Sequence, residues 1–179
     1  MSNYPSVTEI LNRYTDFSMI SAETVTAAAD RGTLIHGVCC TIALGVPWMH
    51  EIPEGFEGYI QSFRRWFDLH VEEVLLAEKR LTHPAYLYTG KIDLIIKMKT
   101  EGVVLVDIKT PVALKKIWRW QIAGYCELAI SNKFKIKKGG SLRLSPDGKP
   151  ANMAWSKDYQ ADFLLFLSCL NIHRELAHG

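Results

Sequence analysis

The sequence predicts a mixed α/β fold in which a small central β-sheet is flanked by helices. Short β-type runs cluster between residues 71 and 108, with helical patterns before and after them. The run from Val103 to Val106 is apolar on both faces, which is typical of a central strand covered on both sides. A chain of 179 residues with 48% hydrophobic residues is expected to form one domain spanning residues 1–179.

Three helices are expected before the sheet, over about residues 6–70. Ser6 and Glu9 have the spacing of a capping box, which predicts a helix over 6–14. A longer helix over 21–44 is rich in Ala and Thr, and Gly45 and Pro47 follow its predicted end. Residues 54–69 carry aromatic and aliphatic residues at helical spacing.

The sheet and its helix are expected over about residues 71–145, followed by a closing helix over 158–176. A turn is expected at Pro146-Asp147-Gly148. The predicted strands are 71–79, 85–88, 91–97, 103–108, 134–137 and 141–144, with a helix over 114–130.

Charge and cysteine content narrow the class of protein only loosely. There are 21 basic and 19 acidic residues, a net charge of +2 that neither indicates nor excludes a nucleic-acid binder. The four cysteines include no Cys-x-x-Cys pair, so reduced, mostly buried thiols are expected. No apolar run approaches ~18 residues, and the N-terminus lacks the basic and apolar regions of a signal peptide. We therefore expect a cytoplasmic protein without a membrane segment.

Two carboxylates and a lysine stand at the ends of neighbouring predicted strands. Asp107 and Lys109 share one side of their strand because side chains alternate, and Asp93 reaches the same place if the two strands pair. Such carboxylates suit a hard divalent cation, and the ammonium group can orient water or stabilise phosphate charge. The alternative is a surface salt bridge at a strand end.

Three further polar residues accompany this group. Gln121 and Tyr125 are four apart on the predicted helix, on its apolar stripe, so the buried amide needs a partner. That partner is either the backbone, or Lys109 or a bound phosphate. His36 lies on the long N-terminal helix, and a lone histidine in such a position is more often an ordinary core or surface residue than a ligand.

Taken in order, these pieces resemble the PD-(D/E)XK nuclease superfamily, and within it the RecB-like exonuclease branch, in a compact form similar to phage proteins. The resemblance covers residues 6 to 145 and implies a restriction-endonuclease-like core. Its motifs are Ser6-Val7-Thr8-Glu9-Ile10-Leu11, Arg31-Gly32-Thr33-x-x-His36, Gly90-x-Ile92-Asp93, Asp107-Ile108-Lys109-Thr110 and Gln121-x-x-x-Tyr125, with the strand Gly139-Gly140-Ser141-Leu142-Arg143-Leu144 after them.

The resemblance implies a role for each matched residue. Asp93 and Asp107 correspond to the two acidic metal ligands and Lys109 to the catalytic lysine, with Gln121 and Tyr125 completing the catalytic set. One or two Mg²⁺ or Mn²⁺ ions are therefore expected. The remaining expected metal ligands are His36, the backbone carbonyl of Ile108 and, more weakly, Glu78, for which Glu51 and Glu73 are rivals. No iron–sulfur cluster is expected, because relatives that bind one use one early and three late cysteines, and only Cys126 and Cys169 lie in the C-terminal third.

The expected function is metal-dependent DNA cleavage, by an exonuclease acting on single-stranded or duplex ends in recombination or repair. A recombination or replication protein is a possible partner. A structure-specific endonuclease with the same site, a silent nucleic-acid-binding module and a hydrolase of another phosphate ester remain as alternatives. Candidate DNA contacts are Lys115, Lys116, Arg119, Arg64 and Arg65, with a further basic cluster at 133–143. The sequence leaves open the polarity, the strand preference, DNA against RNA, and the oligomeric state.

Overall fold

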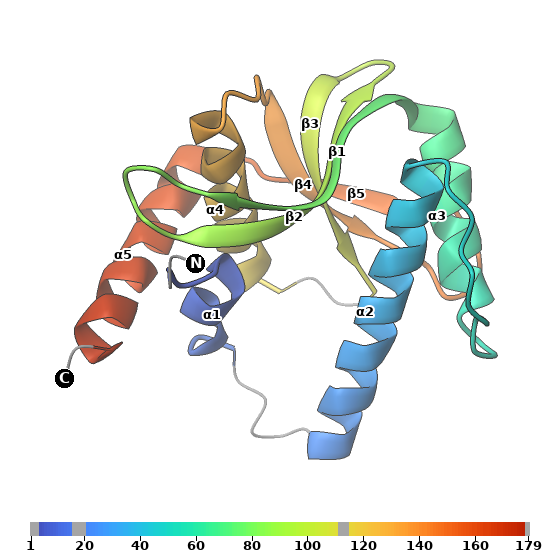
Figure 1. Cartoon of the computed structure of the whole chain (residues 1–179), viewed down its shortest axis with the longest axis horizontal. Helices are drawn as coiled ribbons and strands as arrows, with labels where there is room; N and C mark the ends of the chain where they lie inside the picture. Colours follow the sequence, from blue (N-terminus) through green and yellow to red (C-terminus); the bar gives the residue numbers. More distant parts are fainter. Residues whose placement is uncertain (1–3, 16–20, 111–114, 178–179) are drawn as a thin grey trace.

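The fold is built on a five-stranded mixed sheet with the strand order β1-β2-β3-β4-β5 (Figure 1). The computed structural model describes residues 4–15, 21–110 and 115–177. Strands β3 and β4 are parallel, and the other neighbouring pairs are antiparallel. The strands are β1 (Val71–Thr82), β2 (Thr89–Met98), β3 (Gly102–Lys109), β4 (Lys138–Arg143) and β5 (Asn152–Trp155). The helices are α1 (Val7–Asn12), α2 (Ala22–Ala43), α3 (Glu57–His70), α4 (Ile117–Ser131) and α5 (Tyr159–Ala177).

Helices cover both faces of this sheet. One core cluster joins α1, α4 and α5 to the sheet, and a second joins α2 and α3 to its other face (Figure 1). Val104, Leu105 and Val106 of β3 are each 0% exposed, so burial on both faces of this strand is confirmed. Successive side chains of a strand point to opposite faces of the sheet. Because helices cover both faces here, every position of β3 needs an apolar side chain, and its sequence is a continuous apolar run.

The helix starts follow from local side-chain chemistry. The capping box is confirmed: Ser6 Oγ accepts the backbone N–H of Glu9, and Glu9 Oε2 accepts that of Ser6. Ser21 caps α2 in a similar way by accepting the N–H of Thr24. Helix α3 begins at Glu57, three residues after the predicted start, and Phe56 at its N-cap makes no side-chain cap bond.

The predicted strand over 85–88 is wrong, because these residues form the turn that joins β1 to β2. His83 Nδ1 accepts the backbone N–H groups of Ala85 and Tyr86, and Leu87 has a left-handed φ of 50°. A side chain that collects two backbone donors holds the chain in a turn and removes those donors from any ladder. Of the apolar residues in this segment, Tyr88 points into the core at 0% exposure, whereas Tyr86 and Leu87 are each 40% exposed.

The second half of the sheet also differs from the prediction. Residues 134–137 form no strand, since Lys133 ends the preceding helix with a φ of 70° and Phe134 and Ile136 pack against the core from an irregular segment. Strand β4 begins at Lys138 rather than at residue 141, and β5 was not predicted. The predicted turn at 146–148 is confirmed, with Gly148 at a φ of 75°.

Helix α4 crosses over the sheet between the parallel strands β3 and β4, as such a connection requires. Gly139 allows this close approach, because a Cβ there would lie 2.4 Å from Cys126 Sγ. The crossover sets the start of α4 beside the end of β3. Leu114, where the helix was predicted to begin, lies outside the described residues.

Two further observations concern the whole described chain. The cysteines Cys39, Cys40, Cys126 and Cys169 are all buried and unpaired, as expected for structural thiols. Among the helices that the structure describes, none has the length and apolar character needed to cross a membrane.

Candidate active site

Asp93 and Asp107 lie where the pairing between β2 and β3 ends. The last pair joins Leu94 to Val106; Asp93 directly precedes Leu94, and Asp107 directly follows Val106. Asp107 still pairs with Ser141 of β4, so the β3 backbone is held in the sheet at this point. Helix α2 reaches the same point with His36 from one layer, and α4 reaches it with Gln121 from the other.

The Asp93 carboxylate is held by two partners. Its Oδ2 lies 3.2 Å from His36 Nδ1 and accepts the backbone N–H of Ile108 at 2.8 Å. Burial alone would raise the pKa of Asp93, but His36 and the nearby Lys109 ammonium outweigh it and lower that pKa below its ordinary value. For His36, burial opposes the charged form, yet the Asp93 carboxylate raises the imidazole pKa above its ordinary value. The ionised Asp93 carboxylate and the protonated His36 imidazole therefore stabilise each other.

Asp107 has a different environment. Only 3% of the residue is exposed, and burial raises the pKa of its carboxyl group, a shift that Lys109 opposes and Asp93 reinforces. Asp107 Oδ2 lies 2.8 Å from Lys109 Nζ, but this ion pair lacks hydrogen-bond alignment, and no described residue supplies an aligned donor to that oxygen. The charge of this buried oxygen is therefore balanced mainly by the Lys109 ammonium, and a divalent cation would have to compete with that ammonium for it.

Lys109 is positioned by a chain of contacts that runs along α4. Its Nζ donates to Gln121 Oε1 at 2.9 Å, and Gln121 Nε2 donates in turn to Tyr125 Oη at 3.4 Å. The ammonium also lies 5.5 Å from the centre of the Trp118 ring. The partner of the buried Gln121 amide is thus Lys109, one of the partners expected from the sequence, and α4 holds the ammonium near both carboxylates.

Gly90 explains how Tyr125 can lie against β2. A Cβ on Gly90 would lie 2.7 Å from Tyr125 Cε1 and 3.0 Å from Leu128 Cδ2. Both values are far below ordinary carbon–carbon contact. The glycine of the Gly90-x-Ile92-Asp93 pattern therefore makes room for the tyrosine of the Gln121-x-x-x-Tyr125 pattern.

Glu78 lies near the site without joining it. It falls between the paired positions Ala77–Leu94 and Lys79–Ile92, opposite Asp93, and has a left-handed φ of 49°. Its carboxylate forms an ion pair with Lys91 at 2.9 Å. Glutamate rarely adopts this backbone conformation in a strand, and such strain is often found at functional sites.

The other two candidate glutamates are solvent-exposed. Glu51 precedes α3 and Glu73 lies near the start of β1. Neither makes a described contact with the Asp93 and Asp107 carboxylates. Glu78 thus remains the glutamate nearest to the site.

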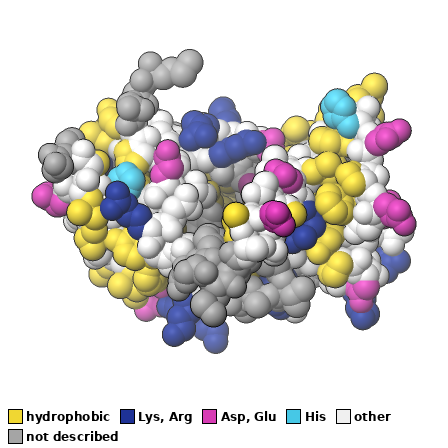
Figure 2. Space-filling view, turned by 90° about the horizontal axis from the view of Figure 1, so that it is seen from below, with side chains coloured by type: hydrophobic (Ala, Val, Ile, Leu, Met, Phe, Trp, Pro, Cys, Tyr) yellow, Lys and Arg dark blue, Asp and Glu magenta, His cyan; other side chains and the backbone are white. Residues whose placement is uncertain are grey.

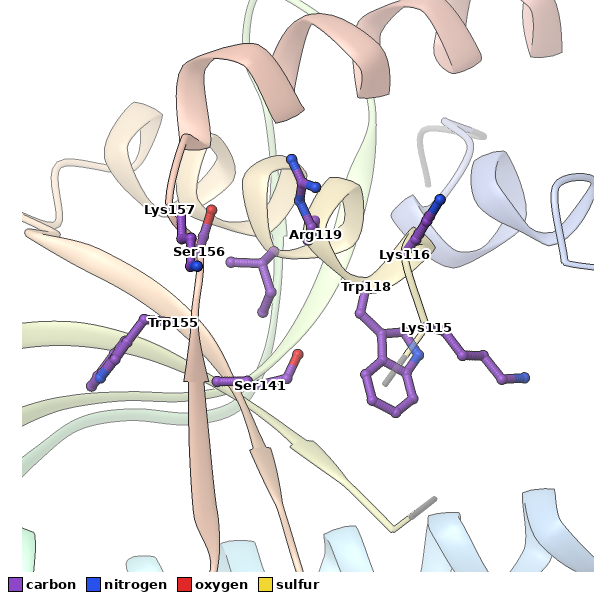
Figure 3. Close-up of a pocket in the computed structure, with 10 residues that line it drawn as sticks. Lys115, Lys116, Trp118, Arg119, Ser141, Trp155, Ser156 and Lys157 are labelled. Carbon is purple, nitrogen blue, oxygen red and sulfur yellow. The ribbon is translucent and has the colours of Figure 1, made fainter. Parts of the chain in front are cut away.

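The candidate DNA-binding residues fall into two separate groups. Lys115, Lys116 and Arg119 are exposed where α4 begins (Figure 3), on the helix whose Trp118 ring contacts the Lys109 ammonium. Arg64 and Arg65 are exposed on α3, in the layer on the other face of the sheet. The first group is therefore the one that lies next to the carboxylates.

The face of the molecule shown in Figure 2 has no dominant charge of either sign. On the face shown in Figure 2, basic and acidic side chains are interspersed with apolar ones, and neither sign dominates the coloured part of the surface. This agrees with the net charge of +2. An interaction with DNA would have to depend on local clusters of cations rather than on the field of the whole protein.

A divalent cation fits the chemistry of this donor set. Two buried carboxylates, an imidazole and a backbone carbonyl are suitable ligands for Mg²⁺ or Mn²⁺. Within residues 4–15, 21–110 and 115–177, however, no three His, Cys, Asp or Glu side chains converge as a metal site. The reason is visible in the contacts: His36 is turned to Asp93, and the ammonium of Lys109 is turned to Asp107. Lys109 and, when protonated, His36 thus neutralise the carboxylates that would hold a metal ion.

Two residues near the site were not singled out by sequence reasoning. Trp118 was expected to pack in the core, which it does at 8% exposure, but its ring also lies against the Lys109 ammonium. Its position three residues before Gln121, on the same helical stripe, was the available signal. Asp162, 0% exposed, accepts from Arg119 Nε and Nη2, and nothing in the local sequence pattern pointed to it.

Comparison with known proteins gives little beyond these residues. No protein-family model matches the sequence, and no match is found among curated proteins. Among solved structures, the chain is similar to an alkaline exonuclease from Laribacter hongkongensis, with 13% sequence identity and a TM-score of 0.45 over 99% of this chain and 92% of that one. A similarity of this size carries no weight for function, so the site has to be argued from its own side chains.

Proposed function

We propose that this protein is a metal-dependent DNA nuclease that hydrolyses phosphodiester bonds. The observation that carries the proposal is the meeting of Asp93, Asp107 and Lys109 at the end of one antiparallel strand pair. Lys109 is fixed there by Gln121 rather than left to solvent. A surface salt bridge would need neither this burial nor a second polar residue on the facing helix.

The two aspartates would hold the cation, with His36 and the Ile108 carbonyl beside them. Ile108 donates its N–H to Asp93, and the N–H and C=O of a strand residue face the same edge, so its carbonyl is directed toward the same strand. When bound, a divalent cation would polarise the phosphodiester and lower the pKa of an attacking water. Binding would require His36 and Lys109 to release their carboxylates.

Lys109 would act on the substrate directly. Its ammonium can orient a water molecule by hydrogen bonding or stabilise the charge that develops on phosphate oxygens. Gln121 and Trp118 hold that ammonium in place, and Tyr125 holds Gln121. Preorganisation of this kind is what makes a charged group effective at the moment of reaction.

The proposal includes finer statements that rest on the family resemblance. An exonuclease acting on DNA ends with one or two Mg²⁺ or Mn²⁺ ions is favoured over a structure-specific endonuclease. A role in recombination or repair beside a replication or recombination protein follows from the same resemblance, and the cytoplasmic location is proposed from the sequence, which shows neither a signal peptide nor a membrane segment. The cations at the start of α4 support a nucleic-acid substrate over a small phosphate ester.

Cleavage of end-labelled DNA tests the function. Purified protein would be incubated with single-stranded and double-stranded DNA in EDTA, Mg²⁺ or Mn²⁺, alongside Asp107→Asn, Lys109→Ala and the surface control Lys149→Ala. We expect metal-dependent shortening from one end, lost in the two site variants and retained in the control. Cleavage of closed circular DNA would instead assign an endonuclease. Retained DNA binding without cleavage in any metal would support the silent binding module and overturn the enzyme.

Metal binding can be measured apart from cleavage. A ligand that binds only the folded protein raises its stability by mass action. We expect Mn²⁺ to raise the melting temperature of the wild-type protein and to raise that of Asp107→Asn much less. Equal shifts in both proteins would place the metal elsewhere.

A further inference from the structure

We propose that the hollow between the start of α4 and strands β4 and β5 binds one unpaired nucleotide of a DNA strand. The base would enter the hollow and the phosphate would lie on its cationic rim. This inference rests on the proposed nuclease function and adds a substrate class to it, namely DNA that is single-stranded next to the cleavage site.

The hollow has the size and lining of a ligand site. Its volume is about 370 Å³, within the range typical of small-molecule pockets. Trp118 and Trp155 lie on opposite sides of it, with Ser141 between them (Figure 3). Ile122 and Ala154 add apolar surface, and the lining is mostly apolar with a few polar groups. A flat heteroaromatic base, apolar on its faces and polar at its edge, fits a site of this composition.

Cations surround the opening. Lys116, Arg119 and Lys157 line the hollow and are exposed, and Lys115 lines it as well. Arg119 is fixed by the fully buried Asp162, which accepts two of its N–H groups, and the Arg119 side chain remains 58% exposed. Asp162 and the exposed Asp158 are the acidic groups that act on Arg119, so the rim keeps an excess of positive charge. An anionic ligand is favoured over a neutral one.

The cationic surface continues beyond the hollow. A second hollow of about 300 Å³ shares Ser156 and Lys157 with the first and is lined further on by Lys137 and Lys138. Lys138 Nζ lies 4.1 Å from the centre of the Trp155 ring. Lysines that follow one another beside aromatic residues form the kind of groove that tracks a single-stranded backbone.

The hollow is also next to the candidate active site. Ser141 in its floor pairs with Asp107 in the β3–β4 ladder, and Trp118 in its wall contacts the Lys109 ammonium. A nucleotide bound there would lie against the residue that pairs with Asp107 and against the ring that contacts the Lys109 ammonium. Neighbouring phosphates of the same strand could then reach Lys109.

A base can enter this hollow only if it is not paired and stacked in a duplex. Removing a base from a duplex costs a few kcal/mol, whereas a single strand offers its bases freely. Stacking on aromatic side chains is worth about 1–3 kcal/mol per base. The site therefore favours single-stranded DNA, a flap or a frayed end over a blunt duplex.

Binding of a labelled oligothymidylate, measured by fluorescence anisotropy in EDTA, tests the inference without cleavage. The same strand with abasic sites measures what the bases contribute. We expect base removal to weaken wild-type binding by about 5- to 100-fold. Trp155→Leu should weaken binding of the intact strand and leave the abasic strand almost unaffected. Tyr86→Leu, which removes a partly exposed aromatic residue at the β1–β2 turn, is the matched control and should behave as wild type.

The rim is tested through the salt dependence of binding. Lys157→Ala should lower the slope of log K against log salt by about 0.7 if its ammonium binds one phosphate, and Lys149→Ala should leave it unchanged. Circular dichroism melting of each variant shows whether the fold is intact. If folded Trp155→Leu still binds the intact strand more tightly than the abasic strand by the wild-type factor, the proposed nucleotide site is wrong. That result would not affect the nuclease proposal, which wild-type cleavage tests separately. If Trp155→Leu loses the difference between intact and abasic strands in a protein that never cleaves DNA, the nucleotide site stands and the nuclease fails.

Discussion

Gly90→Ala should both destabilise the protein and slow its reaction, because this glycine is the surface on which Tyr125 rests. The added Cβ would lie 2.7 Å from Tyr125 Cε1, 3.0 Å from Cδ1 and 3.0 Å from Leu128 Cδ2. Ordinary contact between carbons begins near 3.4 Å, so the ring would have to move by about 0.7 Å. Tyr125 is 5% exposed and packs in the core, which leaves no space for that movement.

Overpacking of this kind costs about 1–3 kcal/mol. For a protein of this length, that loss lowers the melting temperature by about 2–12 °C. The catalytic effect follows from the contact chain, since Tyr125 Oη accepts from Gln121 and Gln121 holds Lys109. A displacement near 1 Å at a reacting group can cost about 100-fold in rate.

Gly32→Ala is the matched control, because it adds the same methyl group in open space. No atom lies within 4 Å of a Cβ at Gly32, and the residue is inside helix α2. Alanine should stabilise that helix by about 0.5–1 kcal/mol and raise the melting temperature by about 1–4 °C. Thermal unfolding by circular dichroism gives both shifts, and single-turnover cleavage well below the transition gives the rate. A Gly90→Ala protein as stable as wild type would refute the packing argument, and one that is less stable but equally fast would refute the link to Lys109.

Three further predictions concern stability. Burial lowers the pKa of His83 below the 6.5 of the free side chain, so the unfolded chain binds the proton first and the free energy of unfolding should fall as the pH decreases below about 6.5. In urea unfolding, His83→Asn should lose less stability than wild type over this pH range. Equal losses in the two proteins would contradict this origin. Arg119→Ala leaves the buried carboxylate of Asp162 without its cation and should lower the free energy of unfolding by about 1–3 kcal/mol. Lys149→Ala removes only an exposed ion pair and should change that free energy very little. A similar loss in both variants would mean that Arg119 does not stabilise Asp162. Ser6→Ala removes the cap of α1 and should lower the free energy of unfolding by about 1 kcal/mol in the same assay, and no change would mean that the cap is dispensable.

The features that the sequence predicted correctly are those governed by near neighbours along the chain. The Ser6–Glu9 capping box depends on residues three apart, and the structure contains both of its hydrogen bonds. The side chains of Asp107 and Lys109 meet because strand residues two apart share a face. The burial of β3 on both faces could also be predicted, since a run of apolar residues without alternation leaves no side for water.

The errors have two causes: a neighbouring side chain takes the backbone donors of a predicted strand, or pairing with a distant strand outweighs a weak local preference. Residues 85–88 have strand-forming side chains, but the His83 imidazole takes their backbone donors and makes a turn. Residues 152–155 carry little strand signal, and they become β5 because β4 offers them an edge to pair with. Local propensity is worth tenths of a kcal/mol per residue, less than a set of ladder hydrogen bonds formed against a buried sheet.

The candidate site divides along the same line. The sequence by itself determined which polar residues are present, in what order, and that Asp107, Lys109, Gln121 and Tyr125 share faces in pairs. Only the tertiary structure decided that Gln121 binds Lys109 and that Asp93 binds His36. It also decided that Trp118 lies between the Lys109 ammonium and a hollow lined by cations. Periodicity fixes which way a side chain points on its own element. Its partner on another element is chosen by the strand register and the crossover of α4, which depend on the packing of the whole chain.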